Sequence, residues 1–286
     1  SLGSIAGPSL GGIIVSSLGW QYIFWVNVPI GLVAVFLGWK LLPKDLIKVK
    51  EKIDVPGSLV FAIFILALFV ELLLGQQVGY GDPRIIASLV VAVVAFAVFI
   101  RLELRRPQPL LQLALFKNPL FSLSILCAFL VFVANFCFNI ISPFYAQNML
   151  NLSPFYAGFL LMLFPISMVI VAPLSGALSD KIGSELLTFA GLVVMVVAQI
   201  GLAQLHAGSS IPLVGLWIAM LGIGSGLFQS PNNSLIMSKV PRTQLGSAGS
   251  VNSLVRNVGM VVGITLATSI LFYIMSKEAG YRVTGL

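Results

Sequence analysis

Nine long apolar stretches, separated by short polar breaks, dominate the pattern of the chain. They cover residues 2–18, 23–42, 55–77, 84–102, 119–145, 154–176, 185–205, 211–234 and 247–275. Each is near the roughly 20 residues with which an α-helix crosses the hydrocarbon core of a bilayer. Strands of a membrane β-barrel are shorter, about 10 residues, and alternate in polarity. The pattern therefore predicts an all-α membrane protein with nine transmembrane helices in this chain.

Composition agrees with this prediction, because only 9% of the residues are charged while 58% are hydrophobic. A soluble domain has about a quarter of its residues charged. With a mean hydropathy of +1.05, the chain has too few polar groups to cover a globule. Lipid must therefore solvate the helices.

The net charge of +7 first suggests nucleic-acid binding, but its distribution follows membrane topology. Basic residues gather in the breaks after the second, fourth, sixth and eighth stretches, and such loops are cytoplasmic by the positive-inside rule. They are Lys40, Lys44, Lys48, Lys50, Lys52, Arg101, Arg105, Arg106, Lys117, Lys181, Lys239 and Arg242. The opposite side holds only Arg84, Lys277 and Arg282. We therefore expect even-numbered loops in the cytoplasm and no nucleic-acid partner.

The residues that usually carry chemistry are sparse. Cys127 and Cys137 lie in one stretch, about 15 Å apart on a helix, too far for a disulfide. His206 stands alone in a short polar loop. The stretches hold no nucleophile–base pair and no cluster of metal ligands, so we expect no enzymatic activity, no metal and no cofactor. Ser1 opens the chain directly on apolar sequence without a basic leader, which suggests that the chain begins inside a longer protein.

The first stretch carries a specific string of glycines and a proline. Gly3, Gly7 and Gly11 recur every four residues and would form a smooth groove for a neighbouring helix, while Pro8 would bend the helix. Ordinary helix packing accounts for the glycine spacing alone. With Gly12 beside it, the whole string resembles the antiporter motif in the fifth helix of major facilitator exporters.

The residues that follow extend this resemblance. Residues 19–31 read GWQYIFWVNVPIG and look like the junction of the fifth and sixth helices in the 14-helix drug:proton antiporters of that superfamily. The resemblance covers essentially the whole chain, whose nine stretches correspond to about helices 5 to 13. It implies that residues 1–42 are the last two helices of an N-terminal six-helix bundle. Residues 43–118 would be two extra central helices with cytoplasmic loops, and residues 119–286 the first five helices of a C-terminal bundle.

A second motif follows the sixth stretch. Gly176, Asp180, Lys181 and Gly183 resemble the cytoplasmic loop signature that major facilitators carry in each half. Asp180 could form an ion pair that breaks and re-forms as the two halves of the protein rock. The glycines allow a tight turn. Ser184-Glu185 stands where the family has basic residues. A gating contact and a plain topological turn therefore both remain open.

Polar side chains inside the apolar stretches supply the candidates for a substrate cavity. Residues 224–234 resemble the end of the family's twelfth helix, and Gly222, Gly226, Gln229 and Asn233 would share one helical face. An intramembrane arginine must face protein or water. The candidates are Asn135, Asn139, Gln229, Asn233 and Arg256. Hydrogen bonds between helices, a polar packing seam or a structural ion pair are the alternatives for these residues.

Glu71 is the only acidic residue deep within a stretch. An intramembrane carboxylate is a candidate proton relay. The resemblance, however, places Glu71 on one of the two extra central helices, which favours a polar contact near the outer surface.

Taken together, the resemblance implies a partial major facilitator fold in the cytoplasmic membrane. It implies a monomer that exports amphipathic drugs or toxic compounds by alternating access, with protons and the small substrate as partners and the proton gradient as the energy source. Because the first four helices and the last are absent, we expect the chain alone to be inactive. A dedicated exporter of a lipid, siderophore or metabolite would share every motif. A membrane scaffold or receptor without transport is a further alternative.

Overall fold

The computed structural model describes residues 19–279 except residues 20, 42–53, 80, 106–112, 239, 242 and 243. Most of the described residues are helical, and none of them forms a strand. The helices of the first part are α2 (Tyr22–Leu41), α3 (Val55–Val78), α4 (Pro83–Arg105) and the short η1 (Leu113–Lys117). Then come α5 (Pro119–Phe144), η2 (Tyr145–Met149), α6 (Pro154–Leu161), α7 (Leu163–Ile182), α8 (Ser184–Ala203), α9 (Ile211–Ser238) and α10 (Leu245–Ala279). The first predicted helix, with the motif of Gly3, Gly7, Pro8, Gly11 and Gly12, lies outside the described residues.

The predicted helical spans are confirmed wherever the structure describes them. Within the described part of the chain, eight helical segments are long and apolar enough to cross a membrane. The sixth of the nine predicted stretches is formed by α6 and α7, which a break at Met162 separates. α7 reaches Ile182 and α9 reaches Ser238, beyond the predicted ends. Polar residues such as Ser179 extend these helices because backbone hydrogen bonding continues past the apolar stretch.

Local sequence sets several helix ends. The Asp54 Oδ1 accepts from the Gly57 amide at 2.9 Å and caps α3. The Asn118 Oδ1 accepts from the amides of Leu120 and Phe121 at the start of α5, where Pro119 occupies the first turn. Caps of this kind satisfy amide groups that have no partner within the helix.

The other end of α5 is distorted. Pro143 cannot donate a backbone hydrogen bond, and a π-helical turn, η2, follows it. The Tyr145 hydroxyl then donates to the His206 carbonyl at 2.9 Å. This bond ties the end of α5 to the loop between α8 and α9.

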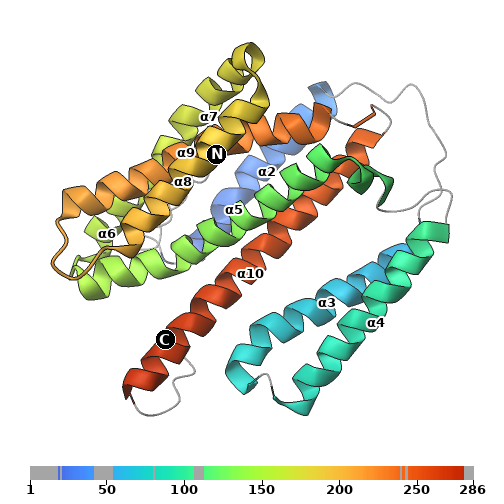
Figure 1. Cartoon of the computed structure of the whole chain (residues 1–286), viewed down its shortest axis with the longest axis horizontal. Helices are drawn as coiled ribbons and strands as arrows, with labels where there is room; N and C mark the ends of the chain where they lie inside the picture. The colour runs from blue at the N-terminus through green and yellow to red at the C-terminus, as the bar shows by residue number, and fades with distance from the viewer. Residues whose placement is uncertain are drawn as a thin grey trace.

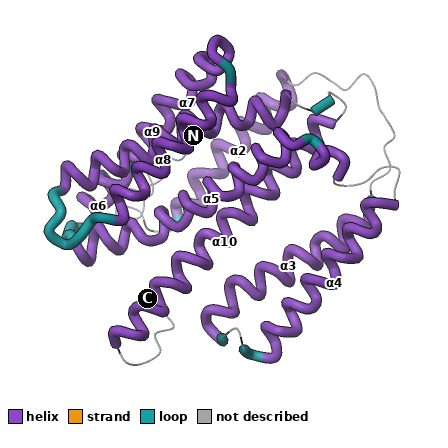
Figure 2. The backbone as a smooth tube through the Cα atoms, viewed as in Figure 1, coloured by secondary structure: helices purple, strands orange, loops and turns teal. Residues whose placement is uncertain are grey.

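The helices run back and forth, so that the α5–α6 and α8–α9 connections lie at one end of the bundle and the α7–α8 and α9–α10 connections at the other (Figures 1 and 2). α9 packs extensively on both α7 and α8, and α10 packs on α5. α3 and α4 form an antiparallel pair beside α10. The Thr265 hydroxyl of α10 donates to the Leu72 carbonyl of α3 at 3.4 Å and joins the pair to α10. α2 buries none of its described side chains. The proposed division of the chain into bundles and extra helices stays a prediction.

Glycines allow the closest of these approaches. A Cβ on Gly226 would lie 2.9 Å from the Met168 carbonyl of α7, and one on Gly222 would overlap the Phe164 carbonyl. On α10, a Cβ on Gly263 would lie 2.5 Å from the Val133 carbonyl of α5. Small residues at these positions are needed because the facing backbones leave no room for a side chain.

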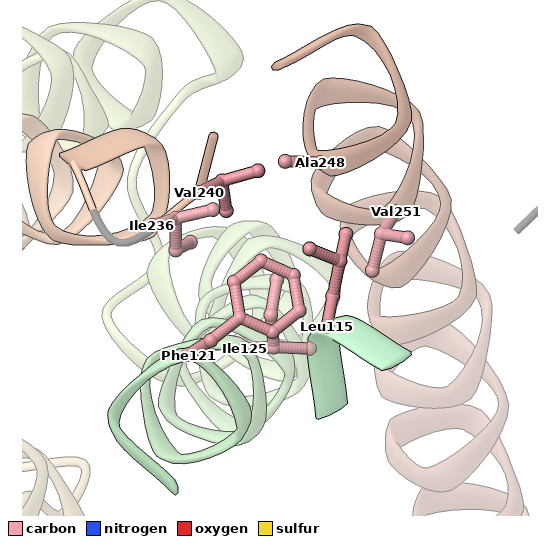
Figure 3. Close-up of a cluster of buried hydrophobic side chains, with 7 residues drawn as sticks. All are labelled: Leu115, Phe121, Ile125, Ile236, Val240, Ala248 and Val251. Carbon is pink, nitrogen blue, oxygen red and sulfur yellow. The ribbon is translucent and has the colours of Figure 1, made fainter. Parts of the chain in front are cut away.

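An apolar cluster joins η1, α5, α9 and α10 at one end of the bundle (Figure 3). Phe121 lies at its centre and is 1% exposed. The cluster consists of Leu115, Phe121, Ile125, Ile236, Val240, Ala248 and Val251. The positive-inside rule predicts that this is the cytoplasmic end, because the α7–α8 connection at the same end carries Lys181. We call it the end cluster.

Candidate substrate cavity

A cavity of about 620 Å³ lies between α5, α7, α9 and α10. Pockets for drug-sized molecules span roughly 300–1,000 Å³. The residues lining it are Ala128, Phe132, Met168, Val169, Ala172, Pro173, Phe228, Gln229, Ser230, Asn232, Asn233, Asn252, Ser253 and Arg256. Its volume is therefore sufficient for a small organic molecule.

The cavity has two chemically different walls. α5 and α7 contribute only apolar residues, among them Phe132, Met168 and Pro173. α9 and α10 contribute all of the polar ones, and Phe228 is the one apolar residue on their side. An amphipathic molecule could thus place its apolar body against one pair of helices and its polar groups against the other.

A hydrogen bond connects the two polar helices. The Asn252 Nδ2 on α10 donates to the Asn233 Oδ1 on α9 at 3.0 Å. Both residues line the cavity. The remaining amide groups, including that of Gln229, leave donors and acceptors that a ligand could use.

Arg256 lies one helical turn beyond Asn252. At a rise of 1.5 Å per residue, Arg256 lies about 16 Å along α10 from the first residue of that helix, Leu245. This distance places it inside the membrane-spanning part. Its guanidinium carbon lies 5.5 Å from the centroid of the Phe132 ring on α5. No described carboxylate forms an ion pair with it, so the expected alternative of a structural ion pair finds no partner within the described part of the chain.

Asn232 belongs to the cavity lining and also forms a buried contact. It is 3% exposed, and its Nδ2 donates to the Ser124 carbonyl of α5 at 3.2 Å. Its Oδ1 is buried without a hydrogen-bond partner among the described residues. Asn232 therefore links α9 to α5 and leaves an acceptor unsatisfied next to the cavity.

The end cluster adjoins the cavity. Ile236 follows Asn232 by one helical turn on α9, and Ala248 precedes Asn252 by one turn on α10. On α5, Ile125 lies about one turn from Ala128. The packed side chains of the cluster thus lie between the cavity and the predicted cytoplasmic ends of these helices.

The structure brings together three of the five residues predicted for a cavity. Gln229, Asn233 and Arg256 all line it. Asn135 and Asn139 do not: the Asn135 Nδ2 bonds the Ser225 Oγ on α9 at 3.4 Å, and the Asn139 Nδ2 donates to the Asn135 carbonyl at 3.3 Å. Contacts of this kind are what the alternative of a polar packing seam predicts for this pair. The role of all five in substrate binding stays a prediction.

Glu71 lies away from the cavity. It is half-buried on α3, next to Leu72, whose carbonyl accepts from Thr265 of α10. It is absent from the cavity lining. A role as proton relay stays a prediction.

The loop motif between α7 and α8 forms a tight turn. Gly183 has a φ of +93° and joins the two helices, a conformation that favours glycine. Gly176 faces α9, where a Cβ would lie 2.9 Å from the Ser230 Oγ. Asp180 and Lys181 are exposed, and neither has an ion-pair partner in the described part of the chain. The motif therefore serves as a turn here, and a gating contact stays a prediction.

Sequence reasoning missed several lining residues. Asn252 was one of them, although it precedes the predicted Arg256 by four residues, a spacing that places both on one face of α10. Asn232 adjoins Asn233 in the same motif. Phe132 and Met168 carried no distinguishing signal, because an apolar residue in an apolar helix gives no indication of whether it faces lipid, protein or a cavity.

Comparisons with known proteins agree with this architecture. Residues 1–264 match the Major Facilitator Superfamily. The chain is 34% identical over 269 residues to the riboflavin transporter RibZ of Clostridioides difficile, covering 94% of this chain and 58% of that protein. It is 31% identical over 275 residues to the multidrug resistance protein Stp of Mycobacterium tuberculosis, covering 95% of this chain and 50% of Stp.

A third relative is the tetracenomycin C resistance and export protein of Streptomyces glaucescens, 30% identical over 279 residues, or 96% of this chain and 51% of that protein. The chain thus spans about half to three-fifths of the length of these relatives. The relatives are transporters, and the apolar helices make this a multi-pass membrane protein with a partial all-α major facilitator fold. The chain belongs to the Major Facilitator Superfamily.

Proposed function

We propose that the whole protein containing this chain exports amphipathic drugs or toxic compounds across the cytoplasmic membrane. The observation that carries the proposal is the cavity with one apolar wall, from α5 and α7, and one polar wall, from α9 and α10. Such a lining suits molecules that are partly apolar and partly polar. No chemical change of the substrate is part of the proposal.

Each wall has a defined task in this proposal. Phe132 and Met168 contact the apolar body of the substrate, and its burial supplies affinity that tolerates different shapes. Gln229, Asn233 and Asn252 bond its polar groups. The substrate would bind near the middle of the membrane while the two bundles rock around it.

Proton coupling completes the proposal. The antiporter resemblance of residues 1–42 and the drug-resistance proteins among the relatives support it. No cofactor is needed, because proton flow down its gradient drives the conformational cycle, and a monomer encloses the whole pathway. Glu71 is the carboxylate within the described helices that stays a candidate for the relay.

The test uses the whole protein in a bacterium that lacks its own efflux pumps. The cells are loaded with Nile red, a neutral amphipathic dye, and its accumulation is followed with and without a protonophore. We expect low accumulation that rises on adding the protonophore. Gln229→Leu, which changes the polar wall, should raise accumulation. Gln204→Leu, the same change at the end of α8 and outside the cavity, should leave it unchanged at equal expression. Accumulation equal to that of empty-vector cells would refute export of such dyes.

A dedicated metabolite transporter is the second candidate. The extent of the polar wall favours it, since seven of the fourteen lining residues are polar, and one relative carries the name riboflavin transporter. Riboflavin combines an apolar ring system with a chain of hydroxyl groups. Riboflavin efflux without Nile red efflux, from the same cells, would favour this second candidate.

A further inference from the structure

We propose that the cavity selects substrates that carry an acidic group, and that Arg256 binds this group. The inference rests on the proposed function in one respect, namely that the cavity is the substrate site. It adds the charge of the substrate, which neither the fold nor the relatives assign.

The first step is the charge of the lining. Arg256 is its one charged residue, and none of the fourteen described lining residues is an acid. A cation within a membrane span is costly unless water or a counter-charge accompanies it. The cavity therefore carries a positive charge that nothing in its described lining neutralises.

The second step is the availability of the guanidinium. It lies over the Phe132 ring, with its carbon 5.5 Å from the ring centroid, and this cation–π contact takes up no hydrogen-bond acceptor. No other described residue hydrogen-bonds or pairs with it. The Arg256 side chain is also exposed and lines the cavity, so it is not buried against other side chains. Its planar fork matches two oxygens of a carboxylate or sulfonate.

The third step is what surrounds this fork. The neighbouring amides and hydroxyls of Asn252, Ser253 and Gln229 can donate or accept, so they do not distinguish one charge from another. Phe132 holds the guanidinium on one side and belongs to the apolar wall. An aromatic or aliphatic acid could therefore place its acidic group on Arg256 and its apolar body along α5 and α7. A cation in the same position would be repelled.

The experiment measures binding, so it does not depend on transport. The purified whole protein in an uncharged maltoside detergent is titrated against fluorescein and rhodamine 123 by fluorescence anisotropy. The two dyes share a xanthene ring system, but fluorescein is anionic at neutral pH and rhodamine 123 is cationic. We expect tighter binding of fluorescein. Arg256→Gln should weaken fluorescein binding by about tenfold or more and leave rhodamine 123 unchanged or tighter. Arg256→Lys, which keeps the charge, should retain part of the fluorescein affinity.

Several results would overturn the inference. One is that the wild-type protein does not bind fluorescein, and another is that wild type and Arg256→Gln bind it with equal affinity. A third is that Arg256→Gln loses affinity for both dyes to the same extent. An equal loss would indicate that Arg256 serves packing. If phosphatidylglycerol in the micelles abolishes fluorescein binding through Arg256 at a few molecules per protein, the site holds a lipid headgroup and the small-substrate assignment is wrong.

Failure of the proposed function would look different. Fluorescein binding that depends on Arg256, together with no protonophore-sensitive export of Nile red, would retain the acidic-group site and reject drug export. Export of Nile red without any charge preference in binding would retain drug export and reject the acidic-group site.

Discussion

Asn233 on α9 and Asn252 on α10 are joined side chain to side chain, the Asn252 Nδ2 donating to the Asn233 Oδ1 at 3.0 Å. α9 and α10 otherwise pack on each other only sparsely. The bond therefore links the two polar helices where they line the cavity.

Breaking this bond should have a small, shared effect on stability. Asn233→Ala and Asn252→Ala each remove the same contact, so the double variant should be less destabilised than the sum of the single ones. The coupling should be about 0.6 kcal/mol, the average for hydrogen bonds between membrane helices. The free energy of unfolding in mixed micelles measures it. Purely additive effects would show that the bond contributes nothing.

Gly222 should not tolerate a larger residue. A Cβ there would overlap the Phe164 carbonyl of α7, and overpacking of this kind costs about 1–3 kcal/mol. We expect Gly222→Ala to lower the midpoint of thermal unfolding in detergent.

Gly246→Ala on α10 provides the matched control. A Cβ at this position would have no heavy atom within 4 Å apart from its chain neighbours and the backbone of its own helix. Alanine also stabilises a helix by about 1 kcal/mol relative to glycine. The midpoint should stay the same or rise. Equal losses in both variants would contradict the close packing of α7 and α9.

Asn232 should matter for stability more than the exposed Asn139. Asn232→Ala removes the hydrogen bond to the Ser124 carbonyl and leaves that buried acceptor without it, at a cost of about 1–3 kcal/mol. Asn139→Ala removes a contact within α5 at an exposed position, so we expect a change within about 0.5 kcal/mol. Thermal unfolding of the two variants compares them directly, and a reversed order would refute the assigned contacts.

The orientation in the membrane can be tested with maleimides. In a protein with Cys127 and Cys137 replaced by alanine, Ala207→Cys lies in the α8–α9 loop and Glu185→Cys at the start of α8. The positive-inside rule places the first outside the cell and the second in the cytoplasm. A membrane-impermeant maleimide on intact cells should label only the Ala207→Cys variant. Labelling of the Glu185→Cys variant alone would invert the topology.

The helical spans could be predicted from sequence because an apolar run of about 20 residues has few stable alternatives in a bilayer. The turn at Gly183 could be predicted equally well, since its motif combines glycine with polar neighbours. The sequence did not allow us to predict which face of each helix packs against which neighbouring helix. Asn135 and Asn233 look alike in sequence, yet one bonds Ser225 and the other lines the cavity. That difference depends on lateral packing, and an apolar helix has no hydrophobic stripe that reveals its partners.

The central claim is that the cavity between α5, α7, α9 and α10 is the substrate site. Its most direct test is the rate at which N-ethylmaleimide labels Ser253→Cys, inside the lining, and Gln204→Cys, outside it, in protein that lacks the native cysteines. Nile red should slow labelling of the Ser253→Cys variant severalfold and leave the Gln204→Cys variant unaffected. Equal rates with and without the dye at the Ser253→Cys position would contradict the assignment of this cavity.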